Sequence, residues 1–143
     1  MPDPFVKYLD ETEAISCPYG HVRRVVTGGE GGAPVNIHVV DVSEGGEHYH
    51  LAYDEVYYVL SGSGQMWMAD QTFDLRSGAV VNVPRGIPHS LKANEGERLV
   101  FIIVGSPGVL IDEDTYLYLT NSKTRAIIEI LKETKPGLPE YWK

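Results

Sequence analysis

The sequence predicts an all-β sandwich or barrel. Glycine and proline are frequent among the 143 residues, at 15 and 9, and the apolar runs between them are short and rich in valine and tyrosine, which favour strands. About ten such runs recur at intervals of roughly eight to twelve residues, the spacing of a sandwich or barrel. The length suits a single domain with one core.

The expected strands are separated by segments in which glycine or proline disfavours a regular ladder. The Gly28–Gly32 segment is the most glycine-rich of these, and Asp70-Gln71 is expected to form the two-residue turn of a hairpin. Residues 1–20 are expected to be a mixed lead-in. The strands themselves are expected at residues 21–27, 35–42, 47–51, 55–60, 65–69, 72–75, 79–83, 89–93, 98–104, 109–111 and 116–119.

One helix is expected near the end of the chain. Residues 124–135 place Ile127, Ile130 and Leu131 on one helical face, and Pro136-Gly137 would stop the helix. We therefore expect one domain over residues 1–143, with a helical C-terminal extension at about 122–135.

Composition excludes several classes of partner. The formal net charge of −8 disfavours nucleic acid, which needs a basic surface. The longest apolar run, residues 99–104, is too short to span a membrane, and the N-terminus carries no signal peptide. The single cysteine, Cys17, allows no intrachain disulfide and favours a cytoplasmic location. A small-molecule substrate remains as the expected partner.

Three histidines and one glutamate are spaced as candidate metal ligands. His48 and His50 lie two residues apart on an extended segment, so both side chains point to one face. Glu55 follows at an odd separation and reaches the same face only if the chain bends at residues 52–54. His89 follows a stiff proline- and glycine-containing loop. Each histidine alone is more often structural, but the set suits iron, manganese, nickel, cobalt, zinc or copper.

The first of these stretches resembles the first motif of the cupin superfamily. That motif has two histidines one residue apart, a glutamate after three or four residues and a glycine after six more. His48, His50, Glu55 and Gly62 have this spacing. The family usually has a further glycine six residues before the first histidine, and this chain has Val42 there.

The second stretch resembles the second cupin motif. That motif has a glycine, five residues, Pro-x-Gly, two residues, a histidine and, after three more residues, an asparagine. Gly78, Pro84, Gly86 and His89 match it, whereas Ala93 occupies the asparagine position. The fifteen residues between the two motifs match the short spacer of small microbial cupins.

The resemblance covers about residues 35–105 and implies a jelly-roll barrel of six to ten strands with a site inside one mouth. It implies that His48, His50, Glu55 and His89 bind a divalent transition metal. Cupins commonly dimerise through edge strands, which suits the apolar segment Phe5–Leu9 and predicts a homodimer. Residues 55–64 resemble the branch described as mannose-6-phosphate-isomerase-like.

Three functions are compatible with this site. The first is a metal-dependent enzyme of isomerase or lyase type acting on a small oxygenated metabolite, although no base other than Glu55 is evident for an isomerase. The second is an iron(II)-dependent dioxygenase, and the third is a non-catalytic protein that binds a small sugar-like ligand. Fold alone does not choose among them.

Three residues near the motifs are candidate catalytic residues. Tyr57 shares the face of Glu55 if that strand is regular and would then hydrogen-bond a substrate oxygen, although a core tyrosine fits equally well. Tyr53 lies in the bend beside the ligands. Arg85, in the Pro84–Gly86 turn, is a candidate partner for an anionic substrate or a solvated loop residue. The pattern does not decide whether His38 faces inward or outward.

Overall fold

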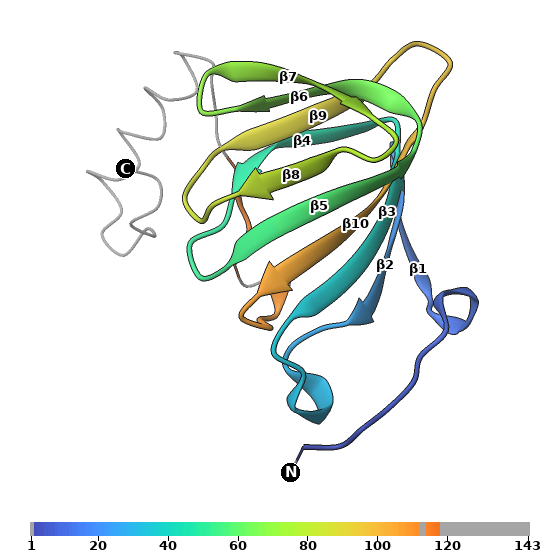
Figure 1. Cartoon of the computed structure of the whole chain (residues 1–143), viewed down its shortest axis with the longest axis vertical. Coiled ribbons are helices and arrows are strands. Elements are labelled where there is room, and N and C mark those ends of the chain that lie inside the picture. Colours follow the sequence, from blue (N-terminus) through green and yellow to red (C-terminus); the bar gives the residue numbers. More distant parts are fainter. Residues whose placement is uncertain (1, 112–113, 118–143) are drawn as a thin grey trace.

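The computed structural model describes residues 2–111 and 114–117, and the helix predicted at residues 124–135 lies outside them. Within the described residues, two antiparallel sheets wrap around a common interior (Figure 1). The predicted all-β fold is confirmed, and it is the jelly roll that the motifs implied. The helices in this part of the chain are two short 3₁₀ turns, Leu9–Glu11 and Glu30–Gly32, so it contains no helix able to cross a membrane.

The larger sheet has six strands in the order β1-β2-β3-β10-β5-β8. Its centre is β10, which pairs with β3 on one side and β5 on the other. The strands are β1 (Ala14–Cys17), β2 (Gly20–Val26), β3 (Asn36–Val42), β5 (Asp54–Ser61), β8 (Val80–Val83) and β10 (Leu99–Ser106).

The smaller sheet has five strands in the order β11-β4-β9-β6-β7. It holds the first histidine motif on β4 and the last histidine on β9, which are neighbours. The strands are β4 (Glu44–Tyr49), β6 (Ser63–Met68), β7 (Gln71–Arg76), β9 (His89–Ala93) and β11 (Tyr116–Leu117).

Strict alternation of side chains separates the interior from the surface. On β5, Glu55, Tyr57 and Val59 are buried, whereas the residues between them are exposed, as expected for a strand with one covered face. The core draws on both sheets, and Met66 of β6 and Leu99 of β10 are fully enclosed. The face that carries Glu55 is therefore the inner face of the barrel.

Two expectations for the chain ends were wrong. The lead-in contains a strand, β1, which pairs with β2 at the sheet edge. Its exposed residues need no apolar alternation, so no strand pattern is visible in this segment. Residues 109–111 do not form a strand. Instead, the carbonyl oxygen of Val109 accepts a hydrogen bond from the side-chain amide of Asn36 (2.7 Å), which fixes this segment as a loop.

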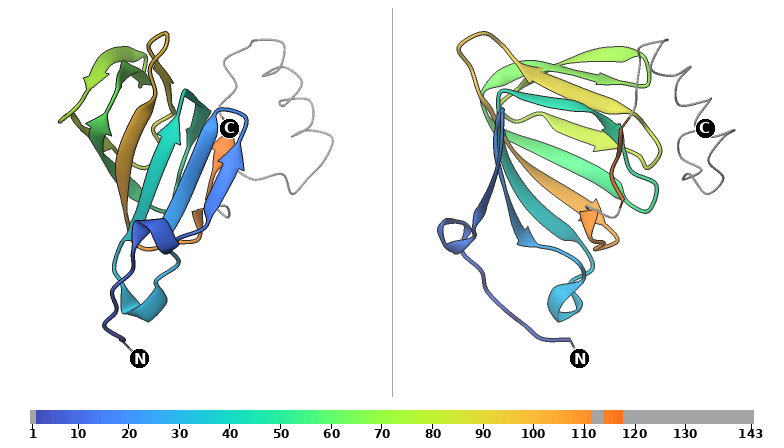
Figure 2. Two further views of the ribbon diagram at one scale, coloured as in Figure 1. Left: turned by 90° about the vertical axis from the view of Figure 1, so that its right-hand side faces the viewer. Right: turned by 180° about the vertical axis from the view of Figure 1, so that it is seen from behind.

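The N-terminal segment passes outside the barrel. From β1 it runs to the loop after β2, where the backbone N–H of Asp3 donates to the carbonyl of Gly31 (2.9 Å) (Figure 2). The apolar side chains of this segment stay exposed, including Val6 and Tyr8. The dimer predicted from Phe5–Leu9 is not tested by the single chain.

The β6–β7 hairpin turns one residue earlier than expected. Met68 pairs with Gln71, so the turn residues are Ala69 and Asp70, and both have positive φ, 48° and 65°. Two consecutive positive φ values define a type I′ turn, which matches the twist of the flanking strands. Aspartate tolerates this region, but alanine does so rarely, so composition pointed to the wrong pair.

Gly62, between β5 and β6, is expected to be intolerant of any side chain. Its φ is +91°, and a Cβ would strike the carbonyl oxygen of Arg98. Gly96 also has positive φ, but a Cβ there meets nothing within 4 Å. Gly96→Ala should cost about 1 kcal/mol of unfolding free energy from backbone strain alone. Gly62→Ala should cost at least about 2 kcal/mol more because of the added clash.

Chemical denaturation of the two variants beside the parent chain measures this difference. Equal losses of stability in both variants would show that the contact with Arg98 does not restrict Gly62.

Candidate metal centre

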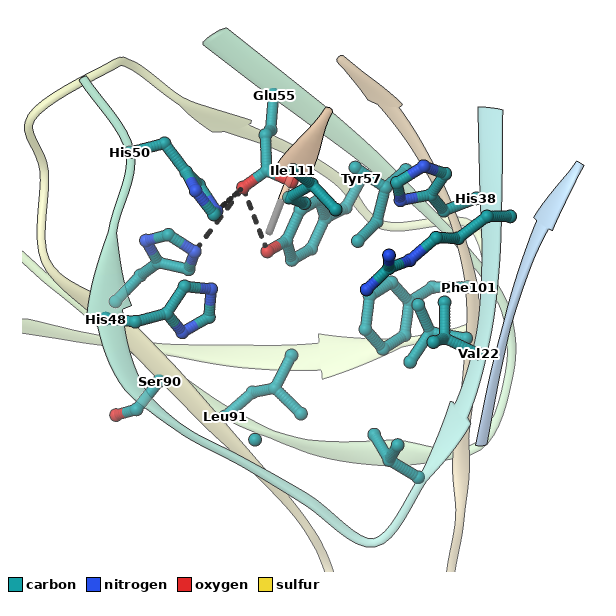
Figure 3. A pocket seen from close by; sticks show the side chains of 16 residues that line it. Val22, His38, His48, His50, Glu55, Tyr57, Ser90, Leu91, Phe101 and Ile111 are labelled. Atoms are coloured by element: carbon teal, nitrogen blue, oxygen red, sulfur yellow. Dashed lines mark hydrogen bonds and ion pairs between the residues drawn. The ribbon is translucent and has the colours of Figure 1, made fainter. Parts of the chain in front are cut away.

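A cavity of about 230 Å³ lies between the two sheets. Its walls are mostly apolar and are contributed by strands β2, β3, β4, β5, β9 and β10; the polar side chains among them are histidines, Arg24, Glu55, Tyr57 and Ser90. Figure 3 shows His48, His50 and Glu55 on one side of this space and His38, Phe101 and Val22 on the other. This volume is somewhat below that of typical sites for drug-sized ligands, so the cavity suits a small metabolite.

The structure brings the three motif histidines together. His48 lies near the end of β4, His50 follows that strand directly, and His89 begins β9 opposite His48. One ring nitrogen from each of the three lies within 4.8 Å of the others. Residues separated by about forty positions in the chain therefore converge because β4 and β9 are adjacent.

The backbone fixes the proton on each imidazole ring. Nδ1 of His48 lies 2.7 Å from the carbonyl oxygen of Gly46, and Nδ1 of His89 lies 2.9 Å from that of Ile87. Nδ1 of His50 lies 2.7 Å from the carbonyl oxygen of Asp114. Since a carbonyl oxygen only accepts, Nδ1 must donate in each case. The lone pair of each neutral ring is thus on Nε2, as in metal-binding histidines oriented by a second partner.

Glu55 lies against two of these Nε2 atoms. The chain bends at Leu51-Ala52, overlapping the bend expected at residues 52–54 only at Ala52, and returns so that β5 directs Glu55 inward. Its Oε1 atom lies 3.2 Å from Nε2 of His50 and 3.4 Å from Nε2 of His89. The hydroxyl of Tyr53 donates to Oε2 (3.0 Å), and that of Tyr57 is 3.5 Å from Oε1.

These contacts fit the donor set of a transition metal. The Nε2 atoms of His50 and His89 are buried and have no hydrogen-bond partner, a costly state for a polar atom. Ligand atoms about 2.1 Å from a common ion lie about 3.0–3.4 Å apart in octahedral or tetrahedral geometry, which matches their distances to Oε1 of Glu55. Neutral imidazoles and a carboxylate are suitable ligands for such ions.

The surroundings shift the pKa values of His48, His50 and Glu55 in different directions. Burial, reinforced by His89, lowers the pKa of His48 to about 4. Burial acts in the same direction on His50, but the contact with Glu55 outweighs it and raises the pKa of His50 above its ordinary value. For Glu55, burial favours the neutral form, but His50 and His89 together hold its pKa well below the usual range. Glu55 is therefore ionised at neutral pH.

Asp114 is a supporting residue that sequence reasoning missed. Its backbone carbonyl holds His50, and its buried carboxylate accepts hydrogen bonds from the backbone N–H groups of Leu51 (3.1 Å) and Ala52 (2.9 Å). It thereby fixes the bend that separates His50 from Glu55. The contact joins residues more than sixty positions apart, so no local motif reveals it.

The remaining candidates occupy different places. Tyr57 lines the cavity, as does His38, which faces inward and is buried. Tyr53 is buried behind Glu55. Arg85 is exposed and forms hydrogen bonds to the carboxylate of Asp54 (2.9 and 3.3 Å), away from the cavity-lining residues.

One further arginine lines the cavity, Arg24 of β2. Sequence reasoning did not single it out, because the inward phase of β2 could not be assigned from a segment in which two arginines are adjacent.

Comparison with known families agrees with this architecture. Residues 36–105 match the family described as "Cupin domain" (Cupin_2). The chain has a cupin fold. An uncharacterised protein of Methanocaldococcus jannaschii, MJ1618, is 31% identical over 68 residues, and the match covers 48% of this chain and 54% of that protein. The chain thus matches about half the length of this curated relative.

Solved structures show the same fold. A protein from Planctomyces limnophilus is 24% identical with a TM-score of 0.70, covering 80% of this chain and 97% of that one. Pac13, described as a nucleoside dehydratase, is 14% identical with a TM-score of 0.66, covering 81% and 95%. A variant of oxalate decarboxylase from B. subtilis is 20% identical with a TM-score of 0.71, covering 97% and 42%. Membership in the cupin superfamily is supported, but these comparisons do not reach the isomerase-like branch.

Metal binding at this candidate site should weaken as the pH falls. A protonated imidazole is no ligand, and His50, whose pKa is raised above its ordinary value, takes up a proton at a higher pH than His48, whose pKa is lowered to about 4. The affinity for Co²⁺ should fall by up to about tenfold per pH unit once one proton must be displaced. Titrations followed by cobalt absorption at pH 7.5, 6.5 and 5.5 measure this, and equal affinities would contradict it.

Removing the Asp114 carboxylate should weaken metal binding without removing a ligand. In Asp114→Ala the bend loses its acceptor for Leu51 and Ala52, and affinity should fall about 10- to 100-fold, as for other residues that orient ligands. Asp114→Asn keeps one acceptor oxygen and should lose less. Asp74→Ala, which removes an exposed carboxylate on β7, is the control. Equal affinities in Asp114→Ala and the control would refute the role.

Proposed function

We propose that this cupin is a divalent-metal-dependent enzyme of lyase or isomerase type that acts on a small oxygenated metabolite. We assign His48, His50, Glu55 and His89 as the metal ligands. The observation that supports this most strongly is the fixed orientation of the three rings, whose Nδ1 atoms are held by backbone carbonyls while two buried Nε2 atoms face Oε1 of Glu55. In a neutral ring with Nδ1 protonated, Nε2 carries the lone pair and is the atom able to bind a metal.

A bound divalent ion would polarise an oxygen atom of the substrate and so weaken bonds at the adjacent carbon. The other groups bind, orient and donate protons. Burial, together with the nearby charge of Glu55, raises the pKa of the Tyr57 hydroxyl far above the usual value, so it stays protonated. Tyr57 lines the cavity and, as a protonated hydroxyl, can donate a hydrogen bond to substrate oxygen. Tyr53 holds Oε2 of Glu55 and orients the carboxylate.

An iron(II) dioxygenase is the second candidate, and the small number of carboxylates lining the cavity favours it. Among the described residues that line the cavity, Glu55 is the one carboxylate, and histidines and tyrosines already contact it. A dedicated carboxylate base for an isomerase is therefore not evident, whereas an oxygenase needs none. Two proteins of similar fold are named for dehydratase and decarboxylase activities, and these names support the lyase hypothesis instead.

We also propose that two copies associate through the N-terminal segment and that the protein works in the cytoplasm. The exposed apolar side chains of Phe5, Val6, Tyr8 and Leu9 support the dimer, since such a group suits an interface. The absence of intrachain disulfide pairing, with one cysteine in the chain, supports the location.

Elemental analysis of the purified chain tests the metal site. The parent chain should hold about one equivalent of a transition metal, and His89→Ala should lose most of it, because a neutral donor is removed from the site. His21→Ala is the matched control, since His21 lies on β2 and does not line the cavity. Absence of metal in the parent chain after reconstitution would refute the metalloenzyme and leave a small-ligand binder.

Oxygen dependence separates the two enzyme classes. The dioxygenase should hold iron and consume oxygen with its substrate, whereas a lyase or isomerase should turn over equally well under anaerobic conditions. Tight retention of a ligand with no turnover in either atmosphere would favour the binding protein.

A further inference from the structure

One cation faces the interior of this barrel. Arg24 on β2 pairs with His38 on β3, His38 pairs with Ile103 on β10, and Ile103 pairs with Tyr57 on β5. Residues paired directly across antiparallel strands point to the same face of the sheet, and all four line the cavity. Arg24 is thus in the same inward-facing row as Tyr57, beside the proposed metal site.

The neighbouring inward row shows what an ordinary barrel wall contains. Val22, Val40, Phe101 and Val59 are paired across the same four strands. This row is entirely apolar, and Phe101 stacks on Tyr57 with ring centroids 4.9 Å apart. Arginine is rarely directed into such a wall, because the charge loses hydration there. The row of Arg24 is therefore the polar row of this wall, beside a row that is apolar throughout.

The backbone of β2 is irregular immediately after Arg24. The pairing register with β3 shifts between Arg24 and Val26, so Val25 is an extra residue in the strand. Bulges of this kind change the direction of nearby side chains and occur often beside active sites. The bulge therefore interrupts the alternation of inward and outward side chains in β2 directly after Arg24, which lines the cavity.

Arg24 is separated from the metal ligands by a distance that a small molecule can span. Three strand spacings separate the backbones of Arg24 and Tyr57, roughly 14 Å in total, and the arginine side chain covers part of this. Glu55 lies two residues before Tyr57 on the same face of β5. The guanidinium charge also reaches the metal end: burial and Glu55 raise the pKa of Tyr53, and Arg24 opposes that rise.

The buried carboxylate of Glu55 has its own set of partners. Glu55 is contacted by His50, His89 and the two tyrosines. Arg24 is the one lysine or arginine among the described residues that line the cavity. Its planar guanidinium matches a carboxylate with two parallel hydrogen bonds, and an otherwise apolar cavity strengthens such a contact.

We propose that Arg24 binds a carboxylate of the substrate, so that the substrate is a small acid with a metal-chelating oxygen at one end and a carboxylate at the other. This inference rests on the proposed function for the chelating end, but the contact with Arg24 needs no metal. The cavity volume limits the molecule to a few carbon atoms between the two ends. Arg24, and not the exposed Arg85, is thus the anion-binding residue of this cupin.

Matched pairs of 2-hydroxy acids test the proposal on the full chain loaded with Zn²⁺, which is redox-inert. The pairs are tartronate and lactate, malate and 2-hydroxybutyrate, and 2-hydroxyglutarate and 2-hydroxyvalerate. Each pair shares the chelating head and carbon number, but one member has a second carboxylate in place of a methyl group. At least one dicarboxylate should bind about tenfold or more tightly than its partner by calorimetry.

Three variants test whether Arg24 causes the preference for the dicarboxylate. Arg24→Gln should abolish it, and Arg24→Lys should keep a part of it, because the charge remains without the planar fork. Arg23→Gln is the matched control: Arg23 pairs with Val39, does not line the cavity and should keep the full preference. Thermal unfolding and zinc content establish that each variant is folded and loaded.

The outcomes separate the two proposals. Zinc binding without any dicarboxylate preference, or a preference that survives Arg24→Gln, would overturn the role of Arg24 and leave the metal site intact. Failure of the parent chain to bind any divalent ion would refute the proposed function instead. The same titrations on the metal-free chain then still decide whether Arg24 selects the second carboxylate.

Discussion

The site depends on three hydrogen bonds from imidazole Nδ1 atoms to backbone carbonyls. Two of these bonds are local, since His48 and His89 each contact the carbonyl two residues earlier. The third joins His50 to Asp114, far along the chain. Two rings are therefore oriented by backbone next to them in the chain, but the third is oriented only when Asp114 and β11 pack beside β4. Completion of the donor set is thus coupled to closure of this edge of the smaller sheet.

The inner face of the larger sheet carries an apolar row of side chains beside a polar row. The row of Val22, Val40 and Phe101 supplies apolar burial, the main favourable contribution to folding. The row of Arg24, His38 and Tyr57 holds polar groups that the cavity keeps away from bulk solvent. Because strands fix both rows, the distance between cation and metal ligands is set by strand spacing and not by loop conformation. A site built this way is rigid and selects its ligand by length.

Sequence patterns could predict the parts of this protein that are encoded locally. The spacing of His48, His50 and Glu55 predicted their convergence, because strand alternation and one bend suffice to bring them together. Gly62 and Gly78 marked turns, where the structure has positive φ. The patterns failed where tertiary contacts decide: β1 is an exposed edge strand, and Asp114 acts over a long sequence separation. His38 and Arg24 could not be assigned to a face, because β2 and β3 carry apolar residues on both sides.

Glu55 is the group around which the polar contacts of the candidate site are arranged. The ionised carboxylate is held by two tyrosines and by His50, whose affinity for a proton it increases. This contact offsets part of the cost of burying the charge. Under the proposed assignment, a metal ion would bind His50 at Nε2, the atom that also accepts a proton, so the ion and the proton would compete for this position. Metal binding would then depend on pH, in a site whose rings are already oriented by backbone carbonyls.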